Sequence, residues 1–403
     1  MAAAKGFRDA GHSPSLVAAL VHFDVSFMCW VLLGALGAYV AEDLGLSPAT
    51  KGLVVAVPPL GGAAFRLLLG PLSDRVGIKR LGQLTLALTT VPLLWAALGG
   101  NSTVEVLGIG LLLGVAGASF AVALPLVSRW YPPEHQGLAL GIAGAGNSGT
   151  VIAALAAPRI AEHIGWHGTF AVALGPVVIA WLVFTALAQE PPKPKVSGGG
   201  NLLRLLRDED PRWLCAFYLV TFGGFVGLAG YLPIFFVDRF DLAKVSAGGY
   251  AALCAVAGSL LRPVGGALAD RFGGTRVLVG VLSIVAVAAV VLASLPPLGL
   301  TVFTLAITLG LLGMGNGAVF QLVGVRVPER VGAMTGLVGA AGGIGGFLLP
   351  FGFGALASST GSFAAGFAAF ATAAGLMAVA VGVRDRTWSA VPAPGSRTLE
   401  VAR

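Results

Sequence analysis

Long apolar stretches, separated by short polar loops, dominate this chain of 403 residues. A helix of about 20 apolar residues crosses the hydrocarbon core of a bilayer, which is about 30 Å thick. Only 11% of the residues are charged, whereas a soluble domain carries about 25%. We therefore predict an all-α integral membrane protein. Its twelve expected transmembrane helices lie near residues 16–40, 50–72, 81–98, 104–128, 137–160, 167–188, 211–236, 246–269, 277–295, 298–325, 331–357 and 361–383.

The basic residues are distributed unequally between the two sides of the membrane. With the N-terminus inside, 19 of the 25 Lys and Arg residues fall in cytoplasmic segments and four in outer loops, and the other two lie within spans. Because cytoplasmic loops carry an excess of Lys and Arg, we expect both termini to be cytoplasmic. The net charge of +7 then reflects topology, so no nucleic-acid partner is expected.

The chain contains an internal repeat. The sequence from Gly70 to Gly77 matches that from Gly266 to Gly273 at an offset of 196 residues, and Pro133 and Glu134 match the pair at 328–329 at an offset of 195. Between the halves lies a segment rich in proline, glycine and charge. Two parallel six-helix repeats joined by a cytoplasmic linker resemble the major facilitator fold. The expected domains are a first half at 1–188, a linker at 189–210, a second half at 211–383 and a cytoplasmic tail at 384–403.

Two arginines, Arg66 and Arg262, lie inside apolar spans, also 196 residues apart. Each precedes an acidic residue by eight positions, Asp74 or Asp270, which places it about 12 Å from that helix end and near the bilayer midplane. A charged side chain at this depth is costly and marks a functional site. The alternative is a buried ion pair, but Asp24 is the only carboxylate within the spans. Planar guanidinium groups in this arrangement suit a bound oxyanion.

Neither the cysteines nor the histidines form a cluster that could bind a metal or support catalysis. The three cysteines fall within separate spans and show no CxxC spacing, so we expect no disulfide. We therefore predict no metal, no cofactor and no enzymatic activity. The cysteines are Cys29, Cys215 and Cys254, and the histidines are His12, His22, His135, His163 and His167.

Two glycine-rich stretches, GIAGAGNSGTVIAALAAP (141–158) and GLVGAAGGIGGFLLP (336–350), resemble the signature of the nitrate/nitrite porters, a branch of the major facilitator superfamily. The resemblance covers essentially the whole chain, including YLVTFGGFVGL (218–228) and both span arginines. It implies that the anion is held by Arg66, Arg262, Phe120, Asn147, Tyr218 and Phe222. The matching signature glycines are Gly144, Gly146, Gly149, Gly342, Gly343, Gly345 and Gly346, which either line the pathway or serve helix packing.

The stretches GPLSDRVGIKR (70–80) and GALADRFGGTR (266–276) resemble the loop motif of the superfamily. In that family the motif fastens the cytoplasmic helix ends together while the carrier faces outward. We therefore expect Asp74, Arg75, Asp270 and Arg271 to act in gating, and the alternative is that they serve topology alone.

The resemblance implies a monomeric secondary transporter in a prokaryotic inner membrane. We expect it to move nitrate, nitrite or both by alternating access, with nitrate exchanged for nitrite, because two unpaired charges resist closure of an empty site. One alternative is proton-coupled nitrate symport, with Asp24 as the titratable group. Another is a carrier of the same fold for a different small organic anion. The expected partners are therefore nitrate, nitrite, the lipid bilayer and, under the first alternative, protons.

Overall fold

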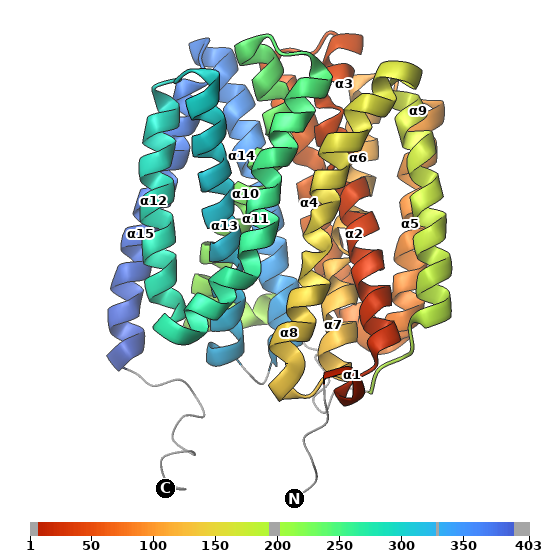
Figure 1. Cartoon of the computed structure of the whole chain (residues 1–403), viewed down its shortest axis with the longest axis vertical. Coiled ribbons are helices and arrows are strands. Elements are labelled where there is room, and N and C mark those ends of the chain that lie inside the picture. The colour runs from red at the N-terminus through yellow and green to blue at the C-terminus, as the bar shows by residue number, and fades with distance from the viewer. Residues whose placement is uncertain (1–6, 193–201, 328–329, 391–403) are drawn as a thin grey trace, which may run out of the picture.

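The protein is a bundle of long helices that stand side by side (Figure 1). The computed structural model describes residues 7–192, 202–327 and 330–390, and all regular structure in these ranges is helical. Eleven helical stretches of this described part are long and apolar enough to span a membrane. One of them, Ala139–Leu187, has 49 residues and breaks at Gly165, whose φ of 74° is not helical. That stretch contains two spans, so the twelve predicted helices agree with the structure.

The first half of the chain is built from interrupted helices, whereas those of the second half are mostly continuous. The first half comprises α1 (Phe7–Ala10), α2 (Ser13–Ala35), α3 (Gly37–Asp43), α4 (Pro48–Val76), α5 (Ile78–Leu98), α6 (Thr103–Gly117), α7 (Phe120–Trp130), α8 (Pro133–Gly144), η1 (Ala145–Ser148) and α9 (Gly149–Leu187). The second comprises η2 (Leu202–Arg207), α10 (Glu209–Phe240), α11 (Lys244–Phe272), α12 (Gly274–Ala293), α13 (Leu298–Arg326), α14 (Val331–Thr360) and α15 (Ala364–Ala390).

The bundle has two ends, which the helix directions distinguish. We call the end where α2 begins and α15 ends the terminal end, and the other the far end (Figure 1). At the far end Ser47 and Ser102 cap α4 and α6, since each hydroxyl oxygen accepts a hydrogen bond from a backbone N–H of the first turn. These caps satisfy N–H groups that have no partner inside the helix.

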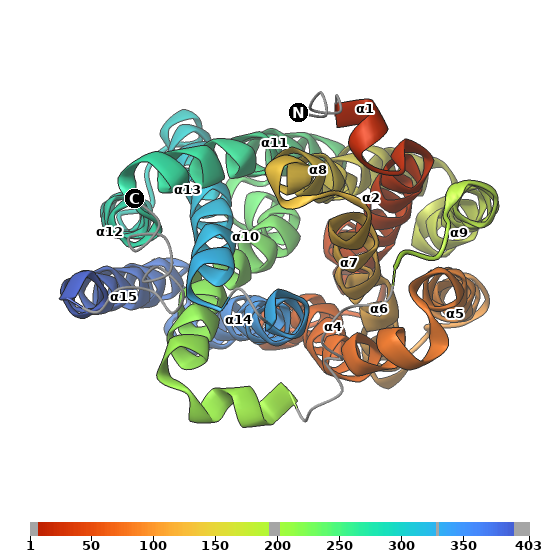
Figure 2. The same ribbon diagram turned by 90° about the horizontal axis from the view of Figure 1, so that it is seen from below.

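The two halves meet along close contacts of α4 with α14 and of α9 with α11 (Figure 2). Small residues allow this approach. A Cβ on Gly52 of α4 would lie 2.8 Å from the Cα of Gly354 in α14, and one on Gly34 of α2 would lie 2.9 Å from the Cα of Gly230 in α10. All four glycines lie toward the far end, so the halves are packed together there.

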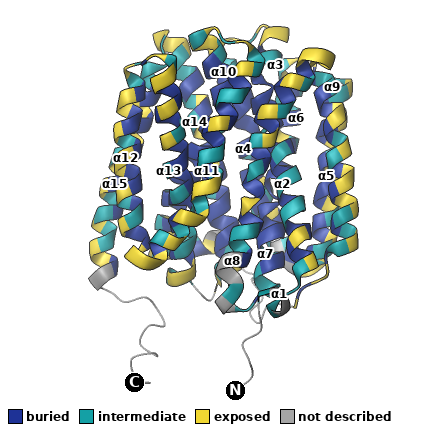
Figure 3. Ribbon diagram, viewed as in Figure 1, coloured by how far each residue is buried: buried dark blue, intermediate teal, exposed yellow. Residues whose placement is uncertain are grey.

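The exposed residues lie on the outward faces of the helices, while the buried residues face the interior of the bundle (Figure 3). Large apolar side chains such as Leu68, Leu98, Leu260 and Val287 are exposed on several different helices. A surface of this kind is stable against lipid tails and not against water. The chain is therefore a multi-pass membrane protein.

Candidate anion-binding site

Arg66 of α4 is fully enclosed, with 1% of its surface exposed. Its Nε and Nη2 donate to the carbonyl oxygen of Gly117 at 3.0 and 2.8 Å, and its Nη1 donates to that of Gly339 at 2.5 Å. Gly117 ends α6, and because Ala121 N–H bonds to Ala118 instead, the helix break leaves the Gly117 carbonyl free for the guanidinium. Gly339 lies on α14, so Arg66 also joins the two halves of the protein.

Arg262 of α11 lies against the same Phe120 ring as Arg66. Its Cζ is 5.8 Å from the centroid of that ring, and the Cζ of Arg66 is 5.6 Å from the same centroid. Arg262 has no hydrogen-bond partner within the described ranges, and its Nη1 is buried. Neither arginine takes part in any ion pair of the described residues. Two positive charges, one on the fully enclosed Arg66 and one on the partly buried Arg262, thus lie at one site without a carboxylate partner among the described residues.

Aromatic rings enclose the two guanidinium groups. Tyr218 and Phe222 stack on one face of α10 at 4.8 Å, as their spacing of four residues predicts. Phe222 lies under Arg66 at 5.3 Å. The Tyr218 hydroxyl is close enough to interact electrostatically with both arginines, although it makes no hydrogen bond of good geometry among the described residues. The structure therefore brings five of the six expected binding residues together: Arg66, Arg262, Phe120, Tyr218 and Phe222.

Asn147, the sixth expected binding residue, lies in η1 between α8 and α9. Its side chain is buried, and its Oδ1 has no partner in the described structure. The η1 turn contacts both α2 and α11, the helix of Arg262. Asn147 is therefore on the wall of the first half that faces Arg262.

The signature glycines differ in what surrounds them. Gly146 and Gly149 pack against α2, where a Cβ on Gly146 would lie 2.6 Å from the Phe23 ring. Gly342 supports the site itself, because a Cβ there would lie 2.6 Å from the Tyr218 ring and 2.8 Å from Phe222. Three others lie in helix contacts and one has open space around it: Gly343 and Gly346 face Pro59, Gly345 faces Leu219, and Gly144 has no neighbour within 4 Å of a Cβ.

Asp24 of α2 is half-buried and forms no ion pair with either arginine. It accepts a hydrogen bond from the Ser148 hydroxyl at 2.6 Å, next to Asn147. His22, two residues earlier, faces α5 instead, where its Nε2 lies 3.2 Å from Thr85 Oγ1. Asp24 thus lies between α2 and η1, at the margin of the site.

Three of the four expected gating residues have described side chains, and these three form no ion pair among the described residues. Arg75, Asp270 and Arg271 are exposed, and none joins an ion pair of the described residues, while the side chain of Asp74 lies outside them. The ion pairs between the halves are at the far end instead. Lys51 Nζ lies 2.8 Å from Asp238, and Lys244 pairs with Glu42.

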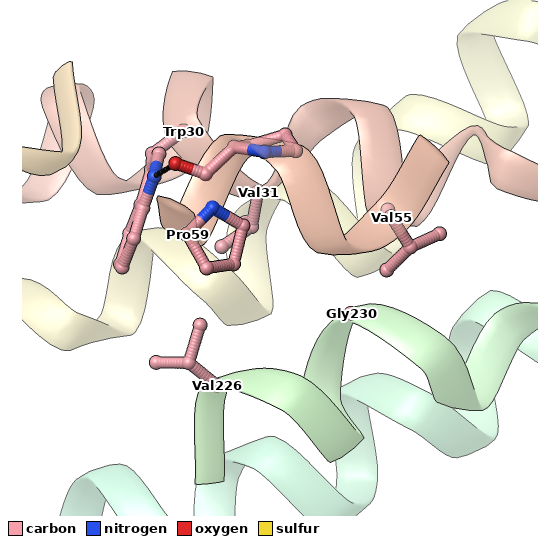
Figure 4. Close-up of a pocket in the computed structure, with 8 residues that line it drawn as sticks. Trp30, Val31, Val55, Pro59, Val226 and Gly230 are labelled. Atoms are coloured by element: carbon pink, nitrogen blue, oxygen red, sulfur yellow. Dashed lines mark hydrogen bonds between the residues drawn. The ribbon is translucent and has the colours of Figure 1, made fainter. Parts of the chain in front are cut away.

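A small apolar pocket lies between the two halves toward the far end. Figure 4 shows the side chains that line it. Trp30 separates it from Arg66, with the ring centroid 5.1 Å from Cζ. The Trp30 indole N–H is bonded to the Pro58 carbonyl at 2.7 Å and so presents only its ring to the pocket. The lining residues come from both halves and are Trp30, Val31, Gly34, Val55, Pro58, Pro59, Val226 and Gly230.

Sequence reasoning missed three residues of the site. Trp30 contacts Arg66, and Phe320 of α13 meets Tyr218 at 5.2 Å, Phe120 at 5.4 Å and Arg262 at 5.7 Å. Asn316, one turn away on α13, is buried and has no partner for either polar atom among the described residues. The repeat contained a signal for Asn316, because it lies 196 residues after Phe120.

Comparison with known proteins places this chain in a family. The family model described as the Major Facilitator Superfamily matches residues 18–350. The fold also matches two solved transporters across nearly their whole length. A bacterial homologue of the human lysosomal transporter Spinster has a TM-score of 0.74 at 17% identity, over 98% of this chain and 100% of that one. The human organic anion transporter MFSD10 has a TM-score of 0.71 at 15% identity, over 92% and 99%. The protein is thus a transporter of the major facilitator superfamily.

Sequence relatives narrow the assignment. The nitrite extrusion protein of Bacillus subtilis is 34% identical over 84% of this chain and 86% of its own. The probable nitrate/nitrite transporter NarK2 of Mycobacterium tuberculosis is 34% identical over 86% and 89%, and the probable nitrate/nitrite antiporter NarK1 of Thermus thermophilus is 33% identical over 81% of both. Within the superfamily, the chain belongs to the nitrate/nitrite porter family, and it is not an enzyme.

Proposed function

We propose that this protein carries nitrate and nitrite across the membrane by alternating access, with the anion bound between Arg66 and Arg262. The observation that carries the proposal is the pair of arginines, one fully enclosed and one partly buried, which lie against the same Phe120 ring and have no carboxylate partner among the described residues. Unpaired buried charge is costly, and a bound anion offsets that cost. The names of the relatives support nitrate and nitrite as this anion.

The chemistry of the site suits a small flat oxyanion. A guanidinium has five N–H donors, of which Arg66 uses three on backbone carbonyls, leaving two. Arg262 makes no hydrogen bond of good geometry within the described structure, although the Tyr218 hydroxyl lies within reach of it, so its buried Nη1 remains available to the anion. The Phe120 ring between the arginines and the stacked Tyr218 and Phe222 rings provide flat surfaces on which a planar anion packs.

Exchange of one anion for another follows from the same electrostatics. When the site is empty, closing it strands two positive charges in an apolar enclosure, so the empty carrier crosses poorly. When an anion is bound, the net charge in the site falls and closure becomes easier. The carrier therefore returns loaded, which couples entry of nitrate to exit of nitrite.

The structure supports one particular state of this cycle. The halves are joined at the far end by Lys51–Asp238 and Lys244–Glu42 and by close backbone contacts of α4 with α14. If the terminal end is cytoplasmic, as the basic residues predict, this is an inward-facing state. In an outward-facing state the two loop motifs at the terminal end would come together.

Counterflow in proteoliposomes tests the proposal. Vesicles containing the protein and loaded with nitrite should take up external nitrate, and vesicles loaded with chloride should not. Formate in competition separates nitrate and nitrite from small organic anions. Equal uptake of nitrate into nitrite-loaded and chloride-loaded vesicles would rule out exchange, and formate uptake in place of both anions would identify a different carrier.

Proton-coupled nitrate symport is the second candidate, and the position of Asp24 is the observation that favours it. The carboxylate is half-buried and bonded to Ser148, next to Asn147 on the wall of the site. Protonation of Asp24 on binding would keep the charge balanced without a counter-anion. Uptake of nitrate driven by an inward proton gradient, with no nitrite inside, would support this mechanism.

A further inference from the structure

Asn316 is a buried amide for which the fold provides no partner. It lies on α13 with 1% of its surface exposed, and neither Nδ2 nor Oδ1 forms a hydrogen bond within the described ranges. Buried polar groups are normally bonded, and an unbonded amide destabilises the folded protein. An orphaned amide of this kind indicates a ligand that occupies the place in another step of the cycle.

The position of Asn316 on α13 connects it to the anion site. It precedes Phe320 by four residues and so shares its helix face, one turn nearer the far end. Phe320 contacts Tyr218 and the guanidinium of Arg262. The next residue, Gly317, packs directly on the backbone of Arg262. Asn316 therefore lies on α13 beside the segment of α11 that carries Arg262.

Two hydroxyl groups lie at the same level. Thr221 follows Tyr218 by three residues on α10, and Ser259 precedes Arg262 by three on α11, each about 4.5 Å along its helix toward the far end. Their hydroxyl oxygens are buried and also lack partners in the described structure. A Cβ on Gly315, the neighbour of Asn316, would lie 2.8 Å from Thr221 Cγ2. Three unpaired polar side chains thus form a layer just beyond Arg262, Tyr218 and Phe320.

The two halves of the repeat carry different side chains at the position of Asn316. Asn316 lies 196 residues after Phe120, so the two halves place an aromatic ring and an amide at equivalent positions. Phe120 packs between the arginines and offers no hydrogen bond. The amide offers two donors at the corresponding place in the second half.

We propose that the amide of Asn316 binds the oxygen of nitrate that the two arginines leave free, and so favours nitrate over nitrite. This inference rests on the proposed function. Nitrate has three oxygens and nitrite has two, so a third donor gains a hydrogen bond only with nitrate. Ser259 and Thr221 complete the layer. Sites built to bond a particular oxygen discriminate against a ligand that lacks it, because their buried groups are then left unpaired.

The test compares the two anions on one variant. Asn316→Leu keeps the volume and removes the donors, and it should raise the KM for nitrate about tenfold, the effect of one hydrogen bond to a charged ligand. The KM for nitrite should stay within about twofold. Thr308→Val is the matched control, because Thr308 is buried on the same helix and bonds only to the Thr304 carbonyl, two turns farther from the arginines. It should change neither KM.

Other outcomes overturn the inference. An equal rise in KM for both anions would assign Asn316 a packing role. No change in either KM would show that Asn316 does not contact the anion. A fall in the maximal rate alone, with both KM values unchanged, would place Asn316 in the conformational change. If the unaltered protein transports neither anion, the proposed function fails first, and titration calorimetry with nitrate and nitrite on the purified variant then tests the amide separately.

Discussion

Arg66 and Arg262 occupy equivalent positions in the two halves, 196 residues apart, yet their hydrogen bonds differ. Arg66 is anchored by three hydrogen bonds to carbonyl groups of Gly117 and Gly339. Arg262 has no hydrogen bond in the described part of the chain, and its Nη1 is buried without a partner. The internal repeat therefore places an arginine at the same position in each half, but the groups around the two arginines differ.

The difference has a cause in the helices. In the first half, α6 ends at Gly117, and the break before Phe120 frees a carbonyl that Arg66 takes up. The corresponding stretch of the second half lies inside α13, which is continuous from Leu298 to Arg326 and has no free carbonyl there. Arg66 is thus held in place by backbone carbonyl groups, whereas the Arg262 side chain can reorient when the anion binds.

The largest effect should come from neutralising either arginine. Arg66→Gln and Arg262→Gln should each lower nitrate counterflow about 100-fold or more, because loss of one partner of a buried charged contact costs about 2–5 kcal/mol. Arg239→Gln is the control, since Arg239 lies at the far end and bonds only to the Leu295 carbonyl among the described residues. Full activity of either site variant would contradict a two-arginine site.

Thermal stability should separate the two arginines. Arg66→Gln should destabilise the empty protein by about 2 kcal/mol or more, because it breaks hydrogen bonds from a charged group to two carbonyls. Arg262→Gln should leave the melting temperature unchanged or raise it, because it removes a partly buried charge that has no carboxylate partner among the described residues. Melting curves without anion measure both, and equal losses would show that Arg262 is anchored as well.

A smaller effect is expected from the far-end ion pairs. Lys51→Met should weaken far-end closure by about 1 kcal/mol, since exposed ion pairs contribute no more than this. Spin labels at Leu98 and Leu300, both exposed near the far end of the two halves, report the distance between them. The population of long distances should increase, and the charge swap of Lys51→Asp with Asp238→Lys should reverse it. An unchanged distance distribution would show that the Lys51–Asp238 ion pair does not help to close the far end.

The smallest effect on exchange should follow from Asp24→Asn. The amide oxygen still accepts the bond from Ser148, so we expect nitrate/nitrite counterflow to stay within about twofold. Any uptake driven by a proton gradient should disappear. Loss of exchange with retention of proton-driven uptake would exclude Asp24 as the coupling group.

Much of the fold could be predicted from the sequence, because apolar length and the bias of basic residues are direct consequences of the bilayer. The two arginines could also be identified from the sequence, because a charged residue stands out in an apolar span and the repeat places the two at equivalent positions. The helix break at Ala118 and Ser119 was not predictable: neither residue excludes a helix, and the span reads as a continuous apolar stretch.

The aromatic enclosure shows the same limit. Phe120 and Phe222 could be selected among 22 phenylalanines only through the family resemblance. Phe320 and Trp30 were missed because nothing in their local sequence separates them from residues that pack a core. Their role depends on which helices meet, and that is set by tertiary contacts such as α4 with α14.

The most direct test of the two-arginine site is a crystal structure or cryo-electron microscopy map of the protein with nitrate. Flat density for one anion should lie between the guanidinium groups of Arg66 and Arg262, against the Phe120 ring, with Arg262 turned toward it and Arg66 unmoved. The density should vanish in Arg262→Gln under the same conditions. Nitrate bound elsewhere, or at the same place without Arg262, would contradict the account.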